Sequence, residues 1–489
     1  MNQTTIFDVL YPTYKITKPI RLIEFFAGYG SQTLALKYLG VDFEHWKICE
    51  WAVKSIQAYK DIHFTDEKQI DIDVTKEQLV ECLYKYGISS NYNEPMTKQQ
   101  IQRLNEKQLK NIWNNIVITH NLVNIQQVKG EDLEIKDTDK YDYILTYSFP
   151  CQDLSLAGKG KGMSDTSTRS GMLWEVERIL TECKELGTLP QMLLMENVPQ
   201  VHGADNVEDF NKWQLRLEEL GYKNYWQDLI ATDYGIPQTR NRCFMVSILG
   251  DYNYTFPKPI PLKLKLKDML EDNVDEKYYL SDDLMKHIQR TAEEHEEYTQ
   301  YDRYNGDLEM WCRVWKDKSP TLNTKCQDTK IYVGNKSLKE TLEQNKIDDT
   351  CYIDTYNKRI DKEKSGTITT GVSFRNNTFL AIKNATKKGY LEATDGDGID
   401  ISSRMEYHRG TVQKGKTQTI TTMGGENNGV VSDDLRIRKL TPKECFRLMG
   451  VKDEDYEKCA KSQSDSSLYH LAGDSIVVNV LMAIFKELL

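Results

Sequence analysis

One cysteine of the chain stands where a nucleophile would be useful. Cys151 lies in the motif SFPCQ, after the apolar run YDYILTYSF and before the glycine-rich stretch LAGKGKGM. A cysteine at the carboxyl end of a strand faces the ligand crevice of an open α/β sheet. Taken alone, a cysteine is more often a small buried thiol. Its position before a glycine-rich loop favours a nucleophile, with residues 152–172 as a lid.

Two further polar motifs lie next to apolar runs. Glu196 ends the run QMLLMEN, which places a carboxylate at the same edge of the sheet as Cys151. Arg240 and Arg242 precede the run CFMVSIL, and strand alternation sends both guanidinium groups to one face. A solvated or capping glutamate and a solvated edge strand are the simpler interpretations. In chain order, these residues supply a nucleophile, an acid and an arginine pair.

A glycine turn near the N-terminus has the pattern of a nucleotide site. In RLIEFFAGYG, an apolar strand enters a turn where Gly28 and Gly30 let the backbone approach a ligand closely. A tight turn that needs positive φ explains these glycines equally well. Glu50, at the end of the next apolar run, favours the nucleotide site because an acid there can accept hydrogen bonds from ribose hydroxyls. Trp51 follows it and can stack on adenine.

The elements that would position these residues indicate an α/β fold. The runs RLIEFF, HWKIC, YDYILTYS, QMLLMEN and CFMVSIL alternate with helical patterns, which predicts a doubly wound, mostly parallel, Rossmann-like sheet. We expect this catalytic domain to span residues 1–257, with a charged helical insertion at about 61–120. Beyond it the chain becomes rich in Lys, Thr and Gly, which predicts a smaller domain of short strands over 258–432. Residues 433–489 are expected to return to the first domain.

Bulk composition narrows the class of protein. The mean hydropathy of -0.61, the lack of an uninterrupted apolar span and an N-terminus without a targeting pattern lead us to expect a soluble protein. The ten cysteines form no Cys-x-x-Cys pair and the eight histidines do not cluster with them, so we expect a reducing cytoplasm and no zinc. The net charge of -10 does not exclude nucleic-acid binding, which depends on a local basic face.

Together, the motifs resemble the DNA cytosine-5 methyltransferase family of bacteria and phages. The blocks RLIEFFAGYG, CEW, SFPCQDLS, MENVP, QTRNR, RKLTPKECFRLMG and LAGDSIVVNV occur in the family's order and cover nearly the whole chain. The resemblance implies methyl transfer from S-adenosylmethionine to carbon 5 of a flipped-out cytosine in a specific double-stranded DNA sequence, through a covalent cysteine adduct. It also implies S-adenosylhomocysteine as product, no metal, a cytoplasmic monomer on DNA, and a restriction-modification setting with a separate endonuclease.

The resemblance further assigns roles to individual residues. Cys151 is the implied nucleophile, and Glu196 would hold nitrogen 3 and the exocyclic amino group of the cytosine. Arg242 would bind the carbonyl oxygen of the base, and Arg240 would support the same pocket. The implied cofactor residues are Phe26, Ala27, Gly28, Gly30, Glu50, Trp51, Asn124, Ile125, Pro150, Leu173, Asp474 and Ser475.

Three positions depart from the family pattern. Glu24 stands where the family more often has aspartate, which keeps the charge. Asp474 replaces the usual asparagine, and because an ionised carboxylate cannot donate a hydrogen bond, its contact with the cofactor stays open. The adenine amino group is usually read by an aspartate followed by isoleucine. Asn124 is the candidate here, since its amide oxygen can accept the bond, and Asp71 and Asp73 compete with it.

The second domain and the substrate class leave alternatives. Four lysines and the repeats KSPTLNT, KSGTITT and KTQTITT could bind DNA phosphates, although exposed threonine is common in strands. A transfer-RNA cytosine-5 methyltransferase would use the same chemistry, but the large second domain favours duplex DNA. A catalytically inactive DNA-binding relative is the other rival, and the intact Cys151, Glu196 and arginine pair argue against it. The four lysines considered as phosphate contacts are Lys258, Lys263, Lys265 and Lys267.

Overall fold

The chain divides into two units, which are described separately. In the computed structural model the first unit comprises Met1–Lys263 with Cys445–Leu489, and the second comprises Leu264–Glu444. Cys151 and Pro150 lie outside the residues that the structure describes. Those residues are 12–149, 170–279, 300–301, 330–331, 352–354, 359–361, 380–384, 390–402, 410–422, 428–432 and 437–489.

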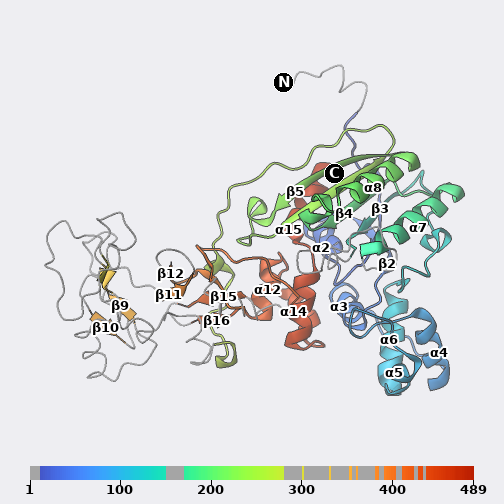
Figure 1. Cartoon of the computed structure of the whole chain (residues 1–489). Coiled ribbons are helices and arrows are strands. Elements are labelled where there is room, and N and C mark those ends of the chain that lie inside the picture. Colours follow the sequence, from blue (N-terminus) through green and yellow to red (C-terminus); the bar gives the residue numbers. More distant parts are fainter. Residues whose placement is uncertain are drawn as a thin grey trace. The chain divides into compact units, whose positions relative to one another are not determined.

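A six-stranded sheet organises the first unit (Figure 1). The order is β2-β1-β3-β4-β6-β5, with parallel pairing from β2 to β4 and antiparallel pairing of β6 with β4 and β5. The predicted fold class is confirmed, and β5 is a strand that the sequence analysis did not predict. The strands are β1 (Ile20–Phe25), β2 (Phe43–Cys49), β3 (Asp142–Tyr147), β4 (Met192–Asn197), β5 (Tyr222–Ile230) and β6 (Asn241–Leu249).

The strand directions bring the polar motifs to one edge of this sheet. The carboxyl ends of β1, β2, β3 and β4 meet there because these strands are parallel. β6 runs the opposite way, so its first residues lie at the same edge: Cys243 pairs with Asn197 at the end of β4. This edge, outside the carboxyl ends of the strands, is where open α/β sheets bind ligands.

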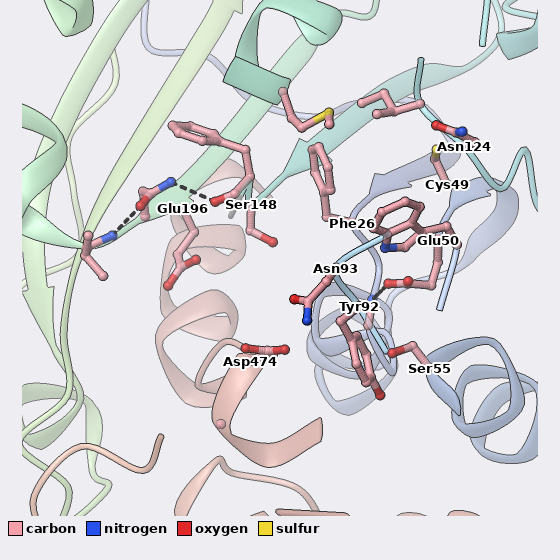
Figure 2. Close-up of a pocket in the computed structure, with 18 of the residues that line it drawn as sticks. Phe26, Cys49, Glu50, Ser55, Tyr92, Asn93, Asn124, Ser148, Glu196 and Asp474 are labelled. Atoms are coloured by element: carbon pink, nitrogen blue, oxygen red, sulfur yellow. Dashed lines mark hydrogen bonds between the residues drawn. The ribbon is translucent and has the colours of Figure 1, made fainter. Parts of the chain in front are cut away.

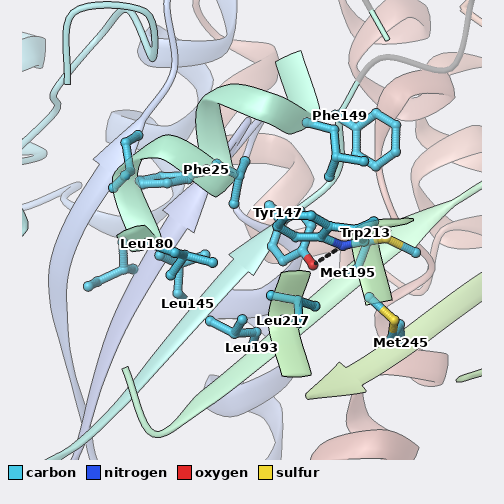
Figure 3. Packing of buried hydrophobic residues seen from close by; sticks show 14 of the residues in the cluster. Phe25, Leu145, Tyr147, Phe149, Leu180, Leu193, Met195, Trp213, Leu217 and Met245 are labelled. Atoms are coloured by element: carbon cyan, nitrogen blue, oxygen red, sulfur yellow. Dashed lines mark hydrogen bonds between the residues drawn. The ribbon is translucent and has the colours of Figure 1, made fainter. Parts of the chain in front are cut away.

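Helices cover both faces of the sheet. On one face, α7 (Leu173–Leu186) and α8 (Val207–Leu220) pack against alternate strand residues, and Trp213 donates a hydrogen bond to the Tyr147 hydroxyl (Figure 3). On the other face, Glu24 of β1 accepts hydrogen bonds from Thr33 of α2 (Ser31–Leu39) and Tyr59 of α3 (Val53–His63). Short 3-10 turns are η1 (Gly130–Leu133), η2 (Ser170–Met172), η3 (Pro199–His202), η4 (Ala231–Tyr234), η5 (Leu266–Met269) and η6 (Glu276–Tyr278).

Three helices fall within the segment expected to be a helical insertion. They are α4 (Lys76–Tyr86), α5 (Lys98–Gln102) and α6 (Glu106–Ile118), and each begins with a capping box that satisfies its first backbone N–H groups. They enclose a small apolar core of their own, which includes Leu83 and Leu109. Between α4 and α5 the chain returns to the end of β2, where Ser89 forms a bridge with Ala52.

The C-terminal residues belong to the first unit. They form α13 (Asp453–Ala460), α14 (Asp465–Asp474) and α15 (Val478–Leu488), preceded by α12 (Pro442–Leu448) at the junction of the units. By length and composition, Asp465–Leu488 is the one stretch of the described residues that could cross a membrane. Most of its apolar window, 67%, is buried within the structure, and core helices of soluble proteins meet the same criterion.

Short antiparallel strands make up the described part of the second unit. The largest sheet has the order β14-β13-β15-β16, and Ile399, Val431 and Ile437 contribute to the apolar core. Of the three threonine repeats only KTQTITT is described, and its Thr417 is buried. The strands are β7 (Gln300–Tyr301), β8 (Lys330–Ile331), β9 (Tyr352–Asp354), β10 (Arg359–Asp361), β11 (Leu380–Lys383), β12 (Tyr390–Ala393), β13 (Gly398–Asp400), β14 (Val412–Gln413), β15 (Asn428–Val431) and β16 (Ile437–Lys439).

Candidate active site

A cavity of about 240 Å³ lies at the carboxyl edge of the sheet in the first unit (Figure 2). Every segment that the strand order brings to this edge contributes to its wall. The lining residues are Phe26, Gly28, Cys49, Glu50, Trp51, Ser55, Tyr92, Asn93, Val123, Asn124, Ile125, Ser148, Phe149, Met172, Glu196, Asn197, Val198, Arg240, Arg242, Gly473 and Asp474.

Most of the residues predicted for the site share this one cavity. Three predicted for the base, Glu196, Arg240 and Arg242, line it together with seven predicted for the cofactor, namely Phe26, Gly28, Glu50, Trp51, Asn124, Ile125 and Asp474. Ala27, Gly30, Leu173 and Ser475 are not part of the lining, nor are the competing Asp71 and Asp73. Ser148 and Phe149, which lead into Pro150 and Cys151, do line it.

Glu50 ties the glycine turn to the end of β2. Its carboxylate accepts hydrogen bonds from the backbone N–H groups of Gly28, at 3.0 Å, and Ala52, at 2.7 Å. The Asn121 side chain holds the Glu50 backbone by accepting from its N–H and donating to its carbonyl. Burial raises the pKa of Glu50 to about 7, although these backbone hydrogen bonds favour the charged form. The carboxylate is therefore fixed before any ligand arrives.

Backbone strain is concentrated around the cavity. Six non-glycine residues of the described chain have φ in the left-handed region, and three of them line the cavity: Phe26 at 56°, Tyr92 at 64° and Val123 at 65°. Such a conformation is rare for aromatic and β-branched residues and costs about 1–3 kcal/mol each. Strained residues of this kind tend to gather at ligand sites, which supports a binding role for the cavity.

Gly28 and Gly30 of the first turn are each required for a different structural reason. At Gly28, φ is +57° and a Cβ atom would meet nothing within 4 Å, so a side chain there would take up cavity space. At Gly30, φ is +83° and a Cβ atom would lie 2.5 Å from His63 Nε2 and 2.7 Å from Tyr59 Cε2. Gly30 therefore permits close packing of α3, whereas Gly28 leaves room for a ligand.

The different surroundings of Gly28 and Gly30 predict different effects of alanine at the two positions, one mainly on cofactor binding and the other mainly on stability. Gly30→Ala should lower the free energy of unfolding by about 2–4 kcal/mol, because overpacking adds to left-handed strain. Gly28→Ala should cost only the strain, about 1–2 kcal/mol, but weaken cofactor binding. Urea denaturation and titration calorimetry with S-adenosylmethionine measure the two effects. Equal stability losses, or unchanged cofactor affinity in Gly28→Ala, would contradict this assignment.

Glu196 is a buried acid whose side chain is incompletely paired. Its Oε1 lies 3.2 Å from Nε of Arg242 as an ion pair, but the geometry is not that of a hydrogen bond and Oε1 makes none. Burial raises the pKa of the carboxyl, the arginines Arg242 and Arg240 oppose this shift, and Asp474 adds to it. A buried acid with a raised pKa and a vacant hydrogen-bonding position is suited to meet a polar ligand.

Asn197, the residue after Glu196, links the end of β4 to the cysteine motif. Asn197 donates a hydrogen bond from Nδ2 to the Phe149 carbonyl at 3.0 Å, and its Oδ1 accepts from the Val198 N–H at 2.8 Å (Figure 2). The end of β4 is thus fastened to the residue that precedes the Pro150–Cys151 pair. The sequence motif MENVP gave no indication of this contact.

The two arginines have different tasks. Arg242 faces the Glu196 carboxylate, whereas the buried Arg240 donates from Nη2 to the carbonyls of Gly473, at 3.1 Å, and Ser475, at 2.7 Å. Arg240 thereby fixes the end of α14. The Ser475 hydroxyl is engaged in structural contacts, since it accepts from the Tyr29 hydroxyl and donates to a backbone carbonyl of α14.

Only one cluster of the described residues has the composition of a metal site. Ligand atoms of His202, Asp228 and Cys243 lie within 4.8 Å of one another. His202 Nε2 and Asp228 Oδ1 already form a hydrogen bond at 2.9 Å, and burial raises the pKa of the Cys243 thiol, which disfavours the thiolate that a metal would need. We therefore assign the His202–Asp228 contact to holding η3 against β5.

Several cavity residues carry no signal in the sequence. Tyr92 and Asn93 come from the insertion, in a loop without a recognisable motif, and Ser55 lies inside α3. Two backbone hydrogen bonds bring the loop to the site: Ser89 donates to the Trp51 carbonyl and Val53 donates to the Ser89 carbonyl. Such a contact between distant segments is a tertiary feature that no local pattern encodes.

Comparison with known proteins defines the class to which this site belongs. Residues 83–489 match the model of the C-5 cytosine-specific DNA methylases, so the chain belongs to that family. It transfers a methyl group to carbon 5 of cytosine in DNA, a reaction for which this family uses S-adenosylmethionine. The expectation of a DNA-modifying enzyme is confirmed, and the transfer-RNA and inactive alternatives are not supported.

One relative spans nearly the whole chain, and others match part of it. A type II methyltransferase of Lactococcus lactis subsp. cremoris, M2.ScrFI, is 29% identical over 96% of this chain and 99% of its own length. The orphan methyltransferase M.SssI of Spiroplasma monobiae is 38% identical over 54% of this chain and 68% of its own. Among solved structures, a methyltransferase of Entamoeba histolytica has a TM-score of 0.48 and 12% identity, with 96% of this chain and 98% of that chain covered.

Proposed function

We propose that the chain methylates cytosine within a specific sequence of double-stranded DNA, through a covalent adduct of Cys151. The observation that carries this proposal is the single cavity that holds both Glu50 and the Glu196–Arg242 pair. One end then takes the cofactor and the other takes a cytosine flipped out of the duplex, which costs a few kcal/mol of stacking and pairing. Cys151 comes two residues after the lining residue Phe149 in the sequence.

The residues at the first end fit S-adenosylmethionine. The space beside Gly28 admits a ligand close to the backbone, and Glu50 offers a fixed acceptor for the ribose hydroxyls. Trp51 and Ile125 supply apolar walls for the adenine, and the Asn124 amide oxygen, which already accepts from the Gln126 N–H, has a second lone pair for the adenine amino group. The bound cofactor supplies an electrophilic methyl group.

The residues at the second end supply the activation that cytosine requires. Carbon 5 is too weak a nucleophile until the Cys151 thiolate adds to carbon 6. Negative charge then spreads toward nitrogen 3, where the Glu196 carboxyl, whose pKa is raised by burial, donates a hydrogen bond in its protonated form. Arg242 holds the carbonyl oxygen of the base. After methyl transfer a base removes the proton from carbon 5, and the thiolate leaves.

Removal of the Arg242 side chain should weaken both the grip on the base and the pairing of Glu196. Arg242→Ala is expected to lower turnover by about 10–100-fold, the range for a lost hydrogen bond to a charged group. Methyl incorporation into a duplex with the target sequence measures this turnover. Arg216→Ala is the control, because Arg216 lies on the surface of α8 and pairs with Glu177 of α7. An unchanged rate in Arg242→Ala would remove this residue from the site.

The wider setting of the reaction is also part of the proposal. Residues 258–432 would recognise the target, with the exposed lysines between Lys258 and Lys267 contacting phosphates. The name of one relative, a type II methyltransferase, fits a restriction-modification setting. The proposal adds a separate endonuclease and a monomer that acts on cytoplasmic DNA. Bisulfite sequencing of DNA from cells that express the chain should reveal methylcytosine in one recurrent sequence. Its absence would contradict the proposal.

A further inference from the structure

Asp474 places a carboxylate between the two ends of the cavity. It is the last residue of α14, its side chain is 50% exposed, and it lines the cavity with Asn93 and Glu196 (Figure 2). Burial raises the pKa of Glu50 and of Glu196, and in both cases the Asp474 carboxylate raises it further. Asp474 therefore lies within electrostatic reach of the proposed ribose position and of the proposed cytosine position.

The surroundings of Asp474 are defined by two contacts. One turn earlier on α14, Nδ1 of His470 lies 3.1 Å from Asp474 Oδ2, although this nitrogen makes no hydrogen bond. The Arg240 guanidinium binds the carbonyls of Gly473 and Ser475, the residues on either side of Asp474 in the chain. The backbone at Asp474 is therefore held by Arg240, and the Asp474 carboxylate lies beside the His470 imidazole.

A tyrosine of the insertion completes this arrangement. The Tyr92 ring stacks on the His470 imidazole, with ring centroids 3.9 Å apart and an angle of 15° between the planes. Tyr92 is one of the strained lining residues, and its loop is fastened at Ser89 to the backbone beyond Glu50. Tyr92, His470 and Asp474, called the clasp below, thus join the insertion to α14 at the cavity.

The chemistry of the clasp selects a cationic group. An ionised carboxylate only accepts hydrogen bonds, and it attracts a cation and repels an anion. An asparagine, usual at this position in the resembling family, could serve either sign of charge. The sulfonium of S-adenosylmethionine joins the adenosine, the reacting methyl group and an amino-acid chain, and the α-ammonium of that chain carries three hydrogen-bond donors.

We propose that Asp474 binds the α-ammonium group of S-adenosylmethionine, and that His470 and Tyr92 are residues that position the Asp474 carboxylate. This inference rests on the cofactor site of the proposed function. It gives the insertion a part in cofactor recognition, since Tyr92 acts on Asp474 through the stacked imidazole.

Ligands with and without the amino-acid chain test the proposal by titration calorimetry on the full chain. Asp474→Asn should weaken S-adenosylmethionine and S-adenosylhomocysteine by about tenfold, equivalent to about 1.4 kcal/mol, because an ionic hydrogen bond is lost. 5′-Methylthioadenosine, which lacks the amino-acid chain, should bind with unchanged affinity. Asp465→Asn, at the other end of α14, is the matched control and should change none of the three affinities.

Substitutions of Tyr92 separate positioning from folding. Tyr92→Ala should weaken the two amino-acid-bearing ligands severalfold and spare methylthioadenosine, and Tyr92→Phe, which keeps the stacked ring, should restore wild-type binding. Equal weakening of all three ligands by Asp474→Asn, or no weakening at all, would overturn the proposal. If the wild-type chain bound all three ligands with equal affinity, the proposed role of the clasp would be refuted, but the proposed cofactor site would not. If it bound none, the cofactor site itself would fall.

Discussion

Replacement of Cys151 by serine should lower methyl transfer to DNA by at least about a thousandfold while S-adenosylmethionine still binds. A serine hydroxyl is almost fully protonated at neutral pH and is a far weaker nucleophile than a thiolate, so carbon 6 of the cytosine would not be attacked. The described cofactor wall is built from the turn after β1 and the end of β2, so its affinity should not depend on the thiol.

Two assays measured on the same preparations distinguish these effects. Incorporation of labelled methyl groups into duplex DNA reports the reaction, and titration calorimetry reports cofactor affinity. Cys82→Ser is the matched control because Cys82 lies in α4, outside the cavity lining, and it should leave both values unchanged. Undiminished turnover in Cys151→Ser would refute covalent catalysis by this residue.

Replacement of Glu196 by glutamine should lower the rate by about 10²–10³-fold, the usual cost of removing a preorganised partner for developing charge. Glutamine keeps the shape and can donate a neutral hydrogen bond to nitrogen 3, but it cannot share a proton with the ring. Asn197 and the cavity wall should stay in place, because the hydrogen bonds of Asn197 do not involve the Glu196 side chain.

The pH dependence gives this substitution a second readout. Burial raises the pKa of Glu196, so the protonated form persists to higher pH than in an ordinary glutamate and is lost as the pH rises through that raised pKa. Thiolate formation at Cys151 changes in the opposite direction, so single-turnover rates should pass through a maximum. In Glu196→Gln the alkaline decline should disappear and the rise should remain. A decline that persists in the variant would assign it to another group.

The catalytic layout was predictable because it depends on local patterns. Apolar runs followed by glycine or glutamate, and one run preceded by arginines, specify strands with polar residues at one end. Parallel pairing of β1 to β4 and antiparallel pairing of β6 bring those ends together. β5 was missed because its sequence, YKNYWQDLI, has no continuous apolar run and forms the edge of the sheet. Only the antiparallel pairing with β6 defines it as a strand.

Contacts between distant segments were not predictable. Tyr92 reaches the cavity because Ser89 pairs with the end of β2, and no spacing rule connects these positions. The same limit applies to Arg240, which the sequence places beside Arg242 and the structure turns toward the end of α14. The sequence pattern predicts that Gly30 lets the backbone approach a ligand. The structure shows instead that the absence of a side chain at Gly30 leaves room for Tyr59 and His63. In each case the partner residue decides the role.

The most direct test of the account is the covalent adduct between Cys151 and DNA. A duplex that carries 5-fluorocytosine at the methylated position should trap it, because fluorine at carbon 5 cannot leave as a proton does and the thiolate cannot be eliminated. After incubation with S-adenosylmethionine and digestion, mass spectrometry should find the modified nucleotide on the peptide that contains Cys151. Absence of any adduct, or an adduct on a different cysteine, would contradict the central claim.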